Sequence, residues 1–258
     1  MAKANQKVEC LDCTDFCRGK DCTVLDWNIL CDFDGTIALK DITDSLLERF
    51  ARPGWETLES AWRSGKLGSR ECMGGQVALL DASQTEIDAH LASMEIDPMF
   101  PAFVAAAKAA GISITIVSDG LDYAISKILA RYALADLPII ANHFEPEGAR
   151  EWSLKFPYSS PSCSVSSGNC KCACVSRARK PPHNILLIGD GASDFCAADA
   201  VDHVFAKARL IDHCTSAGIP HTPIAGFAEA LALLPALIAG RLTKFSSLNV
   251  VQDISSNA

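Results

Sequence analysis

Basic residues are scarce in this chain, and their scarcity excludes one class of partner. The sequence has 23 Lys and Arg residues against 31 Asp and Glu residues, a formal net charge of −8. A protein that binds nucleic acid carries basic stripes to neutralise the phosphate backbone, and no such stripe is visible here. The composition therefore argues against a nucleic-acid partner.

Long apolar runs are also missing. A helix needs about 20 consecutive apolar residues to cross a bilayer, and the longest candidate, near residues 228–239, is interrupted by Glu229 and Pro235. The N-terminus lacks the apolar core of an export signal. We therefore expect a cytoplasmic protein without a membrane partner. The 258 residues, 49% of them hydrophobic, can still bury one sizeable core.

Two carboxylates stand directly after a β-prone apolar run, Trp27 to Cys31. The run predicts a buried strand, so Asp32 and Asp34 would lie at its carboxyl end, where a doubly wound sheet opens its ligand crevice. Two Asp side chains crowded there repel each other unless a cation lies between them, which favours Mg²⁺. An Asp carboxylate can also accept a phosphoryl group covalently. A calcium loop shares this spacing, but the next residues supply too few oxygen ligands.

A second strand signal leads into a phosphate-binding pattern. The β-branched run 112–117 is followed by Ser118, Asp119 and Gly120. A helical pattern then starts at Leu121. A hydroxyl followed by Gly at a helix N-terminus favours a bound anion, because free backbone N–H groups and the helix dipole both attract negative charge.

A third strand signal adds more carboxylates. The apolar run 184–188 leads into a Gly-Asp-Gly-Ala-Ser-Asp segment that contains Asp190 and Asp194. Together with Asp32 and Asp34, these side chains predict an acidic cage suited to Mg²⁺, in which phosphate oxygens fill the remaining positions.

In their order along the chain, these motifs resemble those of the haloacid dehalogenase superfamily of aspartate-nucleophile phosphatases. The resemblance covers roughly residues 28–225. It implies an α/β fold: a doubly wound, mostly parallel sheet (a Rossmannoid core) with a small helical cap domain inserted after the first strand. It also implies a phosphatase that works through an aspartyl phosphate.

The family pattern requires a lysine between the second and third motifs, to neutralise the nucleophile and the transferring phosphoryl group. Lys155 lies far upstream, and Lys180 directly precedes two prolines. Lys171 stands one short helix ahead of the strand predicted from Asn184. We therefore predict that Lys171 is this residue, the alternative being a solvated loop lysine.

The resemblance also implies a role for each residue. Asp32 attacks phosphorus, and Asp34 protonates the leaving oxygen and then activates water. The metal is held by Asp32, the Asp34 carbonyl and Asp190, while Asp194 either binds it through water or supports the site. The implied residues are Asp32, Asp34, Ser118 and Lys171 for catalysis, Asp32, Asp34, Asp190 and Asp194 for the metal, and Gly35, Thr36, Asp119, Gly120 and Asp41 for phosphate or substrate.

The region between the first two motifs reads as helical. Apolar residues recur at helical spacing in 42–50, and Ser83 to Glu86 forms a capping box. Such an insertion resembles the type 1 cap of phosphoserine-phosphatase-like enzymes, a lid that keeps water away from the phosphoenzyme. The expected division is a Cys-rich extension at 1–26, a catalytic core at 27–41 and 102–242, a cap at 42–101 and a tail at 243–258.

The substrate is less sharply indicated than the reaction. Residues 50–55, 119–123 and 205–207 resemble the methionine-salvage enol-phosphate phosphatases. Residues 169–171 and 191–196 are more similar to phosphoserine and phosphocholine or phosphoethanolamine phosphatases. We expect a Mg²⁺-dependent hydrolase of a small-molecule phosphate ester. The sequence does not decide among these substrates, nor between a monomer and a homodimer.

The 12 cysteines suggest a rival class of function. Each of two groups has four thiols, enough for Zn²⁺ or an iron–sulfur cluster, although neither spacing fits a finger pattern. Reduced thiols are the default in a cytosolic chain. The rival is a non-catalytic metal- or redox-sensing protein that uses these thiols. The first group is Cys10, Cys13, Cys17 and Cys22, and the second is Cys163, Cys170, Cys172 and Cys174.

Overall fold

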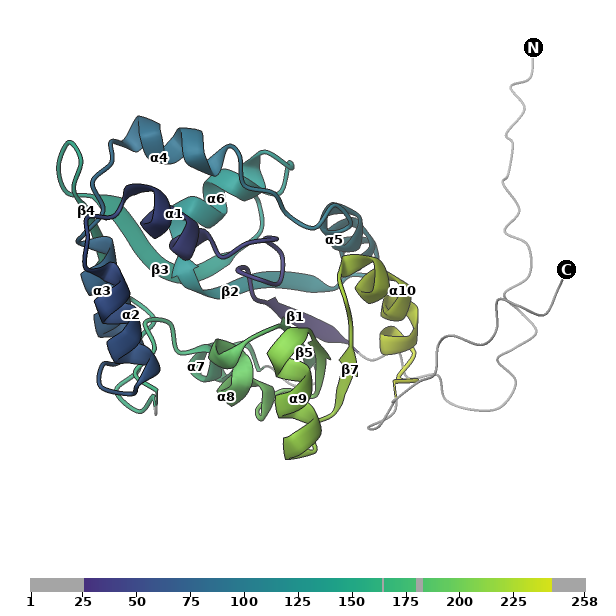
Figure 1. Cartoon of the computed structure of the whole chain (residues 1–258). Coiled ribbons are helices and arrows are strands. Elements are labelled where there is room, and N and C mark those ends of the chain that lie inside the picture. Colours follow the sequence, from purple (N-terminus) through teal and green to yellow (C-terminus); the bar gives the residue numbers. More distant parts are fainter. Residues whose placement is uncertain (1–25, 164, 180–182, 243–258) are drawn as a thin grey trace, which may run out of the picture.

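A seven-stranded sheet forms the centre of the chain (Figure 1). The computed structural model describes residues 26–163, 165–179 and 183–242, so the predictions for the N-terminal Cys group and the tail lie outside the described residues. The strand order is β4-β3-β2-β1-β5-β6-β7, and neighbouring strands are parallel except β3 and β4. The strands are β1 (Trp27–Cys31), β2 (Ser113–Leu121), β3 (Ile139–Pro146), β4 (Trp152–Lys155), β5 (Asn184–Gly189), β6 (His203–Ala206) and β7 (His221–Pro223).

Both faces of the sheet are buried. In β1, Ile29 and Cys31 join one apolar cluster and Leu30 joins the other, as the two-residue period of a strand requires. This arrangement confirms the predicted doubly wound α/β fold. The first cluster includes side chains of α5 (Phe100–Ala109), α6 (Asp122–Ala130) and α10 (Phe227–Ile238); the second includes those of α7 (Lys171–Ala178), α8 (Phe195–Ala198) and α9 (Ala208–Ala217).

Four helices lie between β1 and α5. Ser83 caps one of them with the predicted capping box, in which its hydroxyl accepts the N–H of Glu86. Leu46 and Ile87 are buried in the same apolar cluster as the sheet, whereas α2 has no fully buried residue. The helices are α1 (Ile42–Phe50), α2 (Trp55–Arg63), α3 (Ser69–Val77) and α4 (Gln84–Leu91).

The second strand is longer than the sequence predicted. Instead of ending at Val117, β2 continues to Leu121, and its register with β3 shifts between these two residues. The hydroxyl of Ser118 accepts the N–H of Gly120 at 2.9 Å, which stabilises the irregular strand end. Within the described ranges, none of the helices combines the length and apolar character that crossing a membrane would require.

Candidate active site

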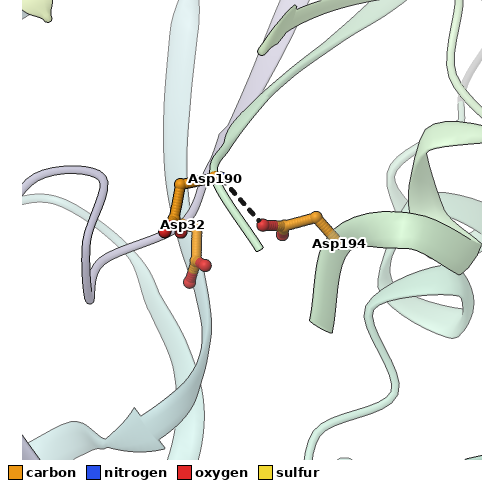
Figure 2. A group of neighbouring side chains, drawn as sticks. All are labelled: Asp32, Asp190 and Asp194. Atoms are coloured by element: carbon orange, nitrogen blue, oxygen red, sulfur yellow. Dashed lines mark hydrogen bonds between the residues drawn. The ribbon is translucent and has the colours of Figure 1, made fainter. Parts of the chain in front are cut away.

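Three carboxylates meet at the carboxyl edge of the sheet. Strands β1 and β5 are adjacent and in register, so Asp32 and Asp190 leave the sheet side by side. Asp194 ends a 3₁₀ turn, η1 (Ala192–Asp194), and faces both of them (Figure 2). One oxygen of each carboxylate lies within 4.8 Å of the others. The backbone N–H groups of Asp190 and Gly191 donate to Asp194 Oδ2 at 3.1 and 3.3 Å, which fixes this third carboxylate.

Lys171 supplies the cation of this group. Its Nζ lies 2.8 Å from Asp32 Oδ2 and 2.7 Å from Asp194 Oδ1, and its side chain is only 1% exposed. Burial alone would lower the pKa of this ammonium, but the charges of Asp194 and Asp32 outweigh burial and raise it above its usual value. Of the other candidates, Lys155 forms an exposed ion pair with Glu145, and Lys180 lies outside the described residues.

The donor set fits a hard divalent cation. Burial, followed by the charge of Asp194, raises the pKa values of Asp32 and Asp190, so an added cation would favour their ionised forms. The ammonium of Lys171 pairs with Asp32 and Asp194, and the charge of Lys207 acts on Asp190, so two cations and three carboxylates leave an excess of one negative charge when all are ionised. Oxygen-only donors and this excess are what Mg²⁺ requires.

Asp34 stands apart from the three carboxylates. Its Oδ1 accepts the backbone N–H of Ile42 at 2.9 Å. Burial, together with the charge of Asp41, raises its pKa to about 8, which favours the protonated form of the side chain. A Cβ on Gly120 would collide with Oδ2 of Asp34, so a larger residue there would displace this carboxyl group.

The turn after Asp34 packs against Asp190. Gly35 has φ +69°, and a Cβ there would lie 2.5 Å from Asp190 Oδ2. The hydroxyl of Thr36 donates to Asp190 Oδ1 at 3.3 Å. Lys207 Nζ donates to the carbonyl oxygens of Gly35 and Thr36 at 2.9 and 3.0 Å. The site residues predicted from the sequence did not include Lys207. Its position directly after an apolar strand run could have identified it as a residue at the same edge of the sheet.

Two buried asparagines, which were also absent from the predicted site residues, form hydrogen bonds with the second motif, residues 118–120. The side-chain amide of Asn169 donates to the carbonyl oxygen of Ser118 at 2.8 Å, and its backbone N–H donates to Asp119 Oδ1 at 2.7 Å. Asn142 Nδ2 donates to Asp119 Oδ1 at 3.1 Å, and Ser69 of α3 donates to Oδ2 at 3.3 Å. The Asp119 carboxylate therefore ties the second motif to the Lys171 loop and to α3.

Asp41 lies where α1 begins. Its carboxylate accepts the N–H of Asp44 at 2.9 Å and so caps the helix. Its charge contributes to the raised pKa of Asp34, which connects this capping residue electrostatically to the site.

The cysteines near Lys171 do not form the predicted metal site. Among the described residues, the carboxylate triad is the one group of three or more ligand atoms close enough to hold an ion. Cys174 is buried and its thiol donates to Asn169 Oδ1 at 3.3 Å, while Cys163 contacts Ser167. Cys170 lies beside both Cys163 and Cys172, but among the described residues no three of these thiols come close enough together to hold an ion. Zn²⁺ and iron–sulfur binding by Cys163, Cys170, Cys172 and Cys174 is therefore not supported.

Comparison with known proteins agrees with the geometry. The model of the haloacid dehalogenase-like hydrolase family matches residues 29–199. A 2-hydroxy-3-keto-5-methylthiopentenyl-1-phosphate phosphatase of Brevibacillus brevis is 33% identical over 209 residues, which are 80% of this chain and 94% of the relative. The enzyme of the same name from Exiguobacterium sibiricum is 34% identical over 205 residues, covering 77% of this chain and 92% of the relative.

Solved structures share the fold. A substrate-bound phosphoserine phosphatase superposes with a TM-score of 0.61 and 19% identity, covering 80% of this chain and 97% of the other. A phospho-aspartyl intermediate analogue of phosphoserine phosphatase gives a TM-score of 0.62 and 18% identity, covering 81% and 98%.

Proposed function

Because the chain belongs to the haloacid dehalogenase-like hydrolase family, we propose that it hydrolyses a small-molecule phosphate monoester through a phosphorylated Asp32. The observation that carries this proposal is the buried contact of Asp32 with Lys171 at the carboxyl edge of the sheet. The ammonium holds one oxygen of the nucleophile and neutralises charge as the phosphoryl group arrives.

Asp34 carries the protons in this proposal. Its raised pKa of about 8 favours a protonated carboxyl group, which can donate to the leaving oxygen. Once deprotonated, it can take a proton from the water that hydrolyses the aspartyl phosphate. Ser118 and nearby backbone N–H groups would hold the phosphate oxygens.

Mg²⁺ fits beside these residues. Asp32, the backbone carbonyl of Asp34 and Asp190 would hold the ion, which neutralises and orients the phosphate when bound. Both oxygens of Asp194 already accept hydrogen bonds, one from Lys171 and one from backbone N–H groups. We therefore assign Asp194 to positioning Lys171 and the 190–191 backbone.

Residues 42–101 would act as the cap. The hydroxyl of Ser69 reaches Asp119, and the N–H of Arg70 donates to the carbonyl oxygen of Ser166 at 3.1 Å, so α3 touches the core beside the site. Such contacts suit a lid that closes over a small substrate. The names of the relatives support 2-hydroxy-3-keto-5-methylthiopentenyl 1-phosphate as that substrate.

The test is phosphate release from a panel of monoesters, in Mg²⁺ or EDTA. The panel contains this enol phosphate, phosphoserine, phosphocholine and phosphoethanolamine. Asp32→Asn keeps the shape of the side chain but removes the nucleophile, so turnover should fall by ~10³-fold or more. Asp88→Asn, at a half-exposed ion pair between α4 and Lys127, is the matched control and should retain activity. Equal activity of Asp32→Asn and the control would reject the proposed nucleophile.

A further inference from the structure

Two thiols lie in contact between helices α7 and α8. The Sγ atoms of Cys172 and Cys196 are 2.7 Å apart, and both residues are partly exposed. A disulfide places its sulfur atoms about 2.05 Å apart. The pair therefore needs only a small shift to become bonded.

The pair lies beside the charged centre of the site. Cys172 directly follows Lys171, and Cys196 lies two residues after Asp194. The Lys171–Asp194 ion pair at 2.7 Å and the thiol contact thus connect the same two segments. Cys174, two residues further along α7, faces Asn169 instead and serves as an internal comparison.

We propose that Cys172 and Cys196 form a reversible disulfide that fastens α7 to α8 when a hydroperoxide is the oxidant. Each thiol loses its hydrogen, the S–S bond forms and the O–O bond breaks. With hydrogen peroxide, the two hydrogens and two electrons leave in two water molecules. A small-molecule thiol reverses the step by thiol–disulfide exchange, and is itself oxidised to a disulfide.

The bond would stabilise the site rather than distort it. Because the sulfur atoms are already in contact, bonding requires little movement of Lys171 or Asp194. It closes a chain loop between residues 172 and 196, which restricts the unfolded state. We expect the melting temperature to rise by ~5 °C or more on oxidation and to return on reduction.

Peptide mapping of the full chain tests the proposal directly, independently of phosphatase activity. The reduced protein is treated with stoichiometric hydrogen peroxide, alkylated and digested with trypsin. The expected product is a cross-link between the fragment of residues 172–177 and the fragment that contains Cys196. It should disappear after dithiothreitol, and in Cys172→Ser and Cys196→Ser. Since the first fragment also contains Cys174, Cys174→Ser is the matched control and should keep the cross-link.

Three results would overturn the proposal. The first is recovery of both fragments alkylated from oxidised wild-type protein that circular dichroism shows to be folded, a result that needs no variant. The second is a cross-link that persists in Cys172→Ser but is lost in Cys174→Ser. The third is one bound Zn²⁺ per chain that both Cys172 and Cys196 are needed to retain.

Discussion

At the scale of single residues, Asp32 and Asp34 show how environment separates two identical side chains. Asp32 has a buried ammonium at 2.8 Å, whereas Asp34 accepts one backbone N–H and has no cation at hydrogen-bond distance among the described residues. Burial then raises the pKa of Asp34 to about 8. Burial raises the pKa of Asp32 as well, so what separates the two carboxyls is the ammonium of Lys171 beside Asp32. In the mechanism that we propose, Asp32 is the nucleophile and Asp34 is the acid.

The pKa of Asp34 predicts a pH dependence of stability in metal-free protein. Between about pH 4 and pH 8 the folded state retains a proton that the unfolded state releases, so this group's contribution to stability falls as pH rises through that window. The side chain of Asp34→Asn cannot ionise, so this variant does not lose that stability as pH rises. Its free energy of unfolding relative to wild type should therefore rise by ~2 kcal/mol or more from pH 5 to pH 8.

Urea unfolding in EDTA at the two pH values measures this difference. Asp136→Asn, at an exposed ion pair with Lys108, is the control and should show no such trend. Parallel pH profiles for Asp34→Asn and wild type would mean that Asp34 is ionised in the folded protein at neutral pH.

At the scale of elements, local patterns predicted some boundaries and missed others. The capping box at Ser83 was readable because its two partners lie three residues apart. The end of β2 was not readable, because Ser118, Asp119 and Gly120 are poor strand formers held by long-range bonds from Asn169 and Asn142. Tertiary contacts outweigh local propensity there.

Helix α7 matters chiefly because it begins with Lys171. Lys171→Met keeps much of the side-chain volume but leaves Asp32 and Asp194 buried without their cation. Breaking a buried ion pair in this way costs about 3 kcal/mol, so we expect the melting temperature to fall by ~6–12 °C and turnover to be lost. Differential scanning calorimetry and phosphate release measure the two effects.

Lys127→Met is the matched control, because Lys127 also pairs with a carboxylate, Asp88, but on the surface. Its melting temperature should stay close to that of wild type. A Lys171→Met protein as stable and active as this control would show that the buried contact has neither role.

At the scale of the whole molecule, the sequence predicted the sheet and the acids at its edge. Strands that are buried on both faces appear in the sequence as apolar runs. Because the carboxyl ends of neighbouring parallel strands lie at the same edge of the sheet, the proximity of Asp32 and Asp190 was predictable. The hydrogen bond from Lys207 to the carbonyl oxygen of Gly35 and the contact of Cys172 with Cys196 were not predicted, because each depends on side-chain conformations that strand patterns do not specify. The division at 42–101 stays a prediction.

The excess negative charge at the sheet edge predicts that Mg²⁺ stabilises the whole fold. Binding to the folded state alone contributes about 2.7 kcal/mol when the ion is at 100 times its Kd, a rise in melting temperature of ~5–10 °C over EDTA. Asp190→Asn removes one charge and one ligand. The variant should melt above wild type in EDTA, because repulsion with Asp194 is relieved, and should gain less from Mg²⁺.

Thermal melts in EDTA, in Mg²⁺ and in NaCl of equal ionic strength separate binding from screening. Asp136→Asn again serves as control and should show the full Mg²⁺ effect, since its exposed carboxylate lies outside the triad. If Asp190→Asn gained as much from Mg²⁺ as this control, the ion would bind elsewhere. The carboxylates of Asp32, Asp190 and Asp194 would then be balanced by Lys171, Lys207 and retained protons.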